Sequence, residues 1–203
     1  MTKLKIILIL FIILVINHSV SGQLSNIQII NYRPNDPFVL EWDCVTVNKY
    51  LLKSKKLVNF NFSNELPQLS IDSLSKKSNY SFYCRVEINS KINSLIFLEK
   101  NTPDTTYGFQ DDLYKFHIHN FNQNCSLLSS CTIHIYERSS DGLSFYGLET
   151  SLTFKNNLII VNEIHEMKPL DLIVRFKITE DTFKTREEHI IQLDNDGFLS
   201  QIK

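Results

Sequence analysis

Three histidines are the residues of this sequence best placed to do chemistry. His117 and His119 alternate along YKFHIHNF, so an extended strand would place both imidazoles on one face. His134, in CTIHIYER, falls on the same face if that segment forms the neighbouring strand. Three imidazoles arranged in this way can ligate zinc and leave a fourth position for water. A zinc-dependent extracellular enzyme is therefore one alternative function.

The same segments also fit an ordinary hairpin with one polar face. Tyr114, Phe116 and Ile118 supply an apolar face for the first strand, as Ile133 and Ile135 do for the second. A register shift of one residue would separate the third histidine from the other two. No acidic side chain is evidently placed as a general base. The sequence therefore favours a protein without catalysis, resident metal or other cofactor.

The remaining short motifs predict structure. DNDG at 194–197 resembles the start of a calcium loop but lacks the later glutamate, so it predicts a hairpin turn. The chain has only five glycines, and no phosphate-binding glycine loop or nucleophile elbow is found among them.

Four cysteines form an even set, which favours two disulfides in an oxidising compartment. Alternation in PFVLEWDCV (37–45) and in the run 79–88 directs Cys44 and Cys84 toward a core, so we expect them to bridge two sheets. Cys125 and Cys131 enclose only SLLSS, which favours a local pair. Four cysteines allow three connectivities, and the other two stay open.

The N-terminus predicts export. Lys3 and Lys5 precede an apolar run at 6–16, and small residues follow up to Gly22. An eleven-residue helix spans roughly 16 Å, about half of the ~30 Å hydrocarbon core, so a cleaved signal peptide at 1–22 is preferred over an uncleaved anchor. No later segment approaches the length of a membrane span. We expect a secreted, extracellular product.

Export would make three sequons usable for N-glycosylation, at Asn61, Asn79 and Asn124. Removal of the two lysines of residues 1–22, which hold no acid, would take the formal net charge from -1 to -3. No basic surface then remains for a nucleic acid partner.

Short alternating runs bounded by turn residues recur along the chain and predict an all-β protein of antiparallel strands. The polar segment 101–112 contains a proline and a glycine and breaks the alternation. We expect a β-sandwich at 23–100, a linker at 101–112 and a second sandwich at 113–203. One large sandwich is the alternative. The predicted strands are 26–32, 37–45, 47–53, 56–62, 67–73, 79–88, 92–98, 113–121, 131–138, 143–147, 149–155, 157–164, 169–178, 187–193 and 197–202.

Residues 37–88 resemble the fibronectin type III and immunoglobulin-like superfamily. FVLEWDC is similar to the tryptophan-bearing second strand of that fold, and Leu74 stands six residues before Tyr80, like its leucine and tyrosine before the sixth strand. Residues 164–178 resemble the same superfamily more weakly. The resemblance implies tandem sandwiches that bind through end loops or an exposed sheet face.

Together these features favour a secreted, glycosylated, disulfide-bonded protein with a non-catalytic binding or adhesion role. The expected partner is an extracellular protein or a carbohydrate. Besides the zinc enzyme, a lipid or sugar carrier stays open, built as a single sandwich around an apolar cavity.

Overall fold

The computed structural model describes residues 26–33, 42–53, 56–61, 80–101, 112–140, 144–169 and 183–202. These residues are mostly β-strand, which confirms the predicted all-β class. The elements are β1 (Ile27–Asn31), α2 (Cys44–Lys53), β2 (Lys56–Leu57), β3 (Asn59–Asn61), β4 (Tyr80–Val86), β5 (Asn93–Asn101), β6 (Asp112–Phe121), β7 (Leu127–Ser140), β8 (Ser144–Lys155), β9 (Leu158–Pro169), β10 (Phe183–Leu193) and β11 (Leu199–Gln201).

The strands form one eleven-stranded sheet in the order β11-β10-β9-β8-β7-β6-β5-β4-β2, with β1 added to β7 and β3 added to β8. β5 and β6 flank the predicted linker, yet they pair as antiparallel neighbours from Asn93 and Phe121 to Asn101 and Leu113. Strands of both halves of the chain thus share one sheet. The expected arrangement of two sandwiches in tandem is not confirmed.

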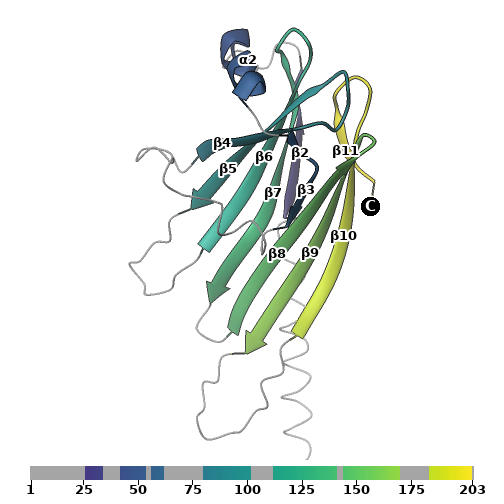
Figure 1. The fold of residues 1–203 in the computed structure, drawn as a ribbon. Helices are drawn as coiled ribbons and strands as arrows, with labels where there is room; N and C mark the ends of the chain where they lie inside the picture. The colour runs from purple at the N-terminus through teal and green to yellow at the C-terminus, as the bar shows by residue number, and fades with distance from the viewer. Residues whose placement is uncertain are drawn as a thin grey trace, which may run out of the picture.

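The hairpin of β7 and β8 turns this one sheet into two layers. The two strands pair only between Tyr136–Ser140 and Phe145–Glu149. Beyond that ladder, β7 pairs with β1 and β8 pairs with β3. Each arm of the hairpin therefore gains a new neighbour as the arms diverge. Figure 1 shows β4 to β7 in one layer and β8 to β10 in the other.

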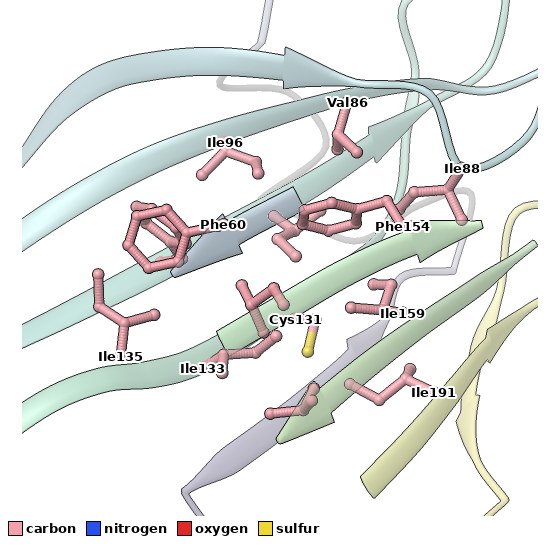
Figure 2. Close-up of a cluster of buried hydrophobic side chains, with 14 of the residues drawn as sticks. Phe60, Val86, Ile88, Ile96, Cys131, Ile133, Ile135, Phe154, Ile159 and Ile191 are labelled. Atoms are coloured by element: carbon pink, nitrogen blue, oxygen red, sulfur yellow. The ribbon is translucent and has the colours of Figure 1, made fainter. Parts of the chain in front are cut away.

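The main hydrophobic core fills the space between the two layers, as Figure 2 shows. Ile133 of β7 and Ile159 of β9 belong to it, and both are fully buried. Phe60 of the short strand β3 enters the same core, with its ring centroid 4.6 Å from that of Phe116. Burial of one such aromatic side chain contributes about 1.5 to 3 kcal/mol. The core therefore holds the two layers together.

A second, smaller core lies under α2. Val47, Tyr50 and Leu51 recur at helical spacing, and all three pack into a cluster with Phe97 of β5. Asp43 caps the helix, because its Oδ1 accepts a hydrogen bond of 2.7 Å from the Thr46 backbone N–H. The prediction of a strand over 47–53 is therefore wrong. A strand would require a period of 2, whereas the buried apolar residues of this segment follow a period of 3.6.

A β-bulge in β4 also changes the expected faces. Phe82 pairs with Phe97 and Cys84 with Ile96, so Tyr83 is the extra residue of the ladder. Phe82 consequently packs toward the core under α2, whereas Cys84 faces the main core. Strict alternation over the predicted strand 79–88 would put Phe82 and Cys84 on one face, and this expectation is wrong, because alternation does not continue across a bulge.

The structure also corrects both predicted disulfides. Cys44, the first residue of α2, is bonded to Cys125 in the loop after β6, with a Cα–Cα distance of 5.1 Å. Cys84 and Cys131 are buried thiols of the main core, and burial raises the pKa of Cys131. The bonded pair lies on the α2 side of the sheet, and the two thiols lie on the other side. The side of the sheet therefore decides the pairing.

Candidate functional site

The three predicted histidines do share one face of the sheet. In the β6–β7 ladder His117 is opposite Thr132, and Lys115 is opposite His134, so alternation places the imidazoles on the same side. His117 is already engaged on both ring nitrogens. Its Nε2 lies 2.7 Å from Glu99 Oε2 and its Nδ1 lies 3.0 Å from Thr132 Oγ1.

His119 is packed among aromatic rings. Its ring centroid lies 5.3 Å from that of Trp42 and 5.4 Å from that of Phe97. Burial lowers the pKa of His119 to about 4, so the imidazole is neutral near pH 7. Burial also lowers the pKa of His117, while the hydrogen bond to Glu99 opposes that change. His117 is thus held by hydrogen bonds, whereas His119 packs against aromatic rings.

A different trio meets the geometry of a metal site. Glu163, Glu187 and His189 each offer a ligand atom, and these three atoms lie within 4.8 Å of one another. They are the one such group among the described residues, so His117, His119 and His134 do not form one. Glu163 of β9 is directly opposite Glu187 of β10, and His189 follows two residues later on the same face.

Glu163 is the buried centre of this acid–histidine cluster, which we define as Glu163, Glu187, His189 and His165. Its side chain is 1% exposed, and its Oε2 accepts hydrogen bonds of 3.1 Å from Asn26 Nδ2 and from His165 Nε2. Burial alone would raise the pKa of Glu163. The hydrogen bonds from His165 and Asn26 and the charge of His189 outweigh burial and lower that pKa.

Tyr146 of β8 completes the surroundings of the cluster. Its hydroxyl lies 2.7 Å from His165 Nδ1. Burial, with Glu137, Glu163 and Glu187 nearby, raises the pKa of Tyr146 to about 12. The hydrogen bond to Glu163 conversely raises the pKa of His165. The arrangement can hold a cation, since it combines carboxylates with imidazole.

The sequence carries a weak signal for this cluster. NEIH (162–165) and EEH (187–189) both place an acid and a histidine two residues apart, on one face of a strand. Each pair alone is common on exposed strands, so neither pair by itself indicates a site. Only the β9–β10 register brings the two pairs together.

A polar hollow of about 490 Å³ opens at the end of the layers where the connections β4–β5, β8–β9 and β10–β11 meet. The backbone N–H of Asn157 donates to Ile88 O at 3.0 Å, and Leu193 N–H donates to Asn157 O at 2.8 Å. These bonds tie the three connections together. The lining residues are Lys56, Val58, Glu87, Ile88, Asn89, Ser90, Lys91, Phe154, Lys155, Asn156, Asn157 and Asn195.

Two of the predicted glycosylation sites can be placed. Asn61 ends β3 and Asn124 lies in the loop after β6, and both are exposed. Asn79 and the predicted signal peptide at 1–22 lie outside the described residues. Within the described ranges, no helix combines the length and the apolar character required to cross a membrane.

Comparison with known proteins does not assign the chain to a family. No family model, no curated protein and no solved structure matches it. The resemblance of residues 37–88 to fibronectin type III and immunoglobulin-like domains therefore stays a prediction.

Proposed function

We propose that this chain is an exported binding protein without catalysis, which takes its ligand in the polar hollow. The observation that carries the proposal is the hollow itself, because turns from both layers converge on it and their backbones are hydrogen-bonded to one another. Loops held on a rigid scaffold are the usual place for binding.

Export is supported by three independent features. The first 22 residues have the charge and apolar pattern of a signal peptide. The bond between Cys44 and Cys125 is of a kind that persists in oxidising compartments. Asn61 and Asn124 are exposed, as acceptors of glycans must be.

The lining of the hollow favours a hydroxyl-rich ligand, that is, a carbohydrate. Side-chain amides at Asn156, Asn157 and Asn195 can both donate and accept hydrogen bonds. Lys56 and Glu87 form an ion pair there, and Lys91 adds a further ammonium group. A surface loop of an extracellular protein would offer related chemistry and is the other partner class.

No observation favours the two alternative functions. The zinc enzyme required His117, His119 and His134 to gather, and they do not. The carrier required an apolar cavity, whereas the space between the layers is occupied by buried side chains such as Phe60 and Phe116.

The test uses the full chain produced by secretory cells. We expect the medium to contain a protein that begins at Gln23, carries glycan at Asn61 or Asn124, and binds members of a carbohydrate array. Lys91→Ala should weaken that binding. Lys184→Ala should not, because this exposed lysine lies at the opposite end of β10.

Retention of the chain inside the cell would refute export. Binding that both lysine variants leave unchanged would refute the hollow as the ligand site. If the array gives no binder, affinity capture with both lysine variants from extracellular fluid tests the protein class of partner.

A further inference from the structure

We propose that Glu163, Glu187 and His189 form a binding site for a divalent transition-metal ion, with zinc as the best fit. The proposal rests on the acid–histidine cluster of β9 and β10. It does not depend on export or on the polar hollow.

The distances within the trio suit a shared ion. His189 Nε2 lies 3.6 Å from Glu163 Oε2 and 3.5 Å from Glu187 Oε2. A cation between these atoms would replace two contacts that are too long for good hydrogen bonds. Two carboxylates and one imidazole form a mixed oxygen and nitrogen set, which suits zinc, whereas calcium and magnesium prefer sites built from oxygen atoms alone.

Glu163 supplies a second, independent observation. Its side chain is 1% exposed, and its buried Oε1 has no hydrogen-bond partner among the described residues. A buried carboxylate oxygen without a partner is rare and costly in a folded protein. Coordination of a cation through Oε1, alone or together with Oε2, would satisfy it.

The surroundings provide the outer shell that metal ligands require. Asn26 and His165 donate to Glu163 Oε2 and fix the orientation of the carboxylate. Gln201 Nε2 lies 3.3 Å from His189 Nδ1 and can donate to it. When a metal binds Nε2 and Nδ1 carries the proton, a flip of this exposed amide would bring its oxygen to Nδ1–H and hold that tautomer.

The site is open on one side. The side chain of Glu187 is 52% exposed and that of His189 is 24% exposed, whereas Glu163 forms the buried wall. An ion can therefore enter past Glu187. Three protein ligands would leave at least one coordination position for water or for an external ligand.

Isothermal titration of the untagged, chelator-treated full chain with zinc chloride tests the proposal. We expect saturable binding with one ion per chain. Zinc affinity should fall at least about tenfold in each of three variants, Glu163→Gln, Glu187→Gln and His189→Gln, because even outer-shell changes cause a loss of that size. Glu188→Gln is the matched control, because this exposed glutamate is next in sequence but lies on the opposite face. Calcium chloride should bind much more weakly than zinc chloride.

Circular dichroism of each variant separates loss of ligation from loss of fold. Glu163→Gln changes a buried group and can unfold the chain, but Glu187→Gln changes an exposed one and keeps the test decisive. Absence of one-to-one zinc binding would overturn the proposal. Binding that Glu187→Gln and His189→Gln leave unchanged would also overturn it, since zinc would then sit elsewhere, for example near His117.

Discussion

Cys44, the first residue of α2, is bonded to Cys125 in the loop between β6 and β7, across a sequence separation of 81 residues. The bond fastens α2 over the second core, where Val47 of the helix is fully buried. It also joins the two halves of the chain that the sequence suggested were separate domains.

Loss of this disulfide should destabilise the protein strongly. A loop of this length corresponds to about 4.5 kcal/mol of unfolding free energy in the chain-entropy model. Cys44→Ser should lower the free energy from denaturant unfolding by roughly that amount. Adding reductant should then lower the unfolding free energy of the wild type but not that of the variant. A nonreduced peptide map that links Cys44 to Cys84 would contradict the structure.

His119 should make stability fall in mild acid. Its pKa is 6.5 in the unfolded chain and about 4 in the folded protein, so below pH 6.5 the unfolded state binds the extra proton. Unfolding free energy should therefore decrease as the pH falls from 6.5 to 4, by about 3 kcal/mol from this group. His119→Phe should flatten the pH dependence over that window in chemical unfolding. An unchanged slope would show that His119 does not titrate in this way.

Phe60 should stabilise the packing of the two layers, because the three-residue strand β3 places its side chain in the main core. It is 2% exposed, so Phe60→Ala should cost about 3 to 5 kcal/mol in denaturant unfolding. Phe183→Ala is the matched control. Phe183 is 58% exposed at the start of β10, and its removal should change the unfolding free energy by about 0.5 kcal/mol or less. Equal losses of unfolding free energy in the two variants would refute this role of Phe60.

A side chain at Gly197 should destabilise the protein. Its φ is +90°, and a Cβ there would come 2.3 Å from Leu128 Cδ1. Gly197→Ala should therefore destabilise the protein by about 1 to 3 kcal/mol, mainly through backbone strain, since the leucine side chain can move. Thermal unfolding measures the loss. Ser200→Ala, at an exposed position of the same hairpin, should leave the melting temperature nearly unchanged.

Local sequence was enough to predict most of the strands that the structure describes, although the two strands expected at 143–147 and 149–155 are the single strand β8. The Asp194–Gly197 turn is confirmed, with Asp194 Oδ1 accepting from the backbone N–H groups of Asp196 and Phe198. The strand at 113–121 is confirmed as β6, and the shared face of its two histidines follows from alternation alone. The helix at 44–53 replaces a predicted strand, although Asp43 is an N-cap residue whose carboxylate accepts from the Thr46 backbone N–H.

By itself, then, the sequence determined the all-β class, the positions of most strands that the structure describes, and the polar face of β6, because these depend on local backbone preference and on period-2 alternation. Only the tertiary structure decided which cysteines pair, which strands share a layer, and that Glu163 and His189 meet. Those outcomes depend on contacts between residues far apart in sequence. A single bulge at Tyr83 reverses faces in a way that no local pattern records.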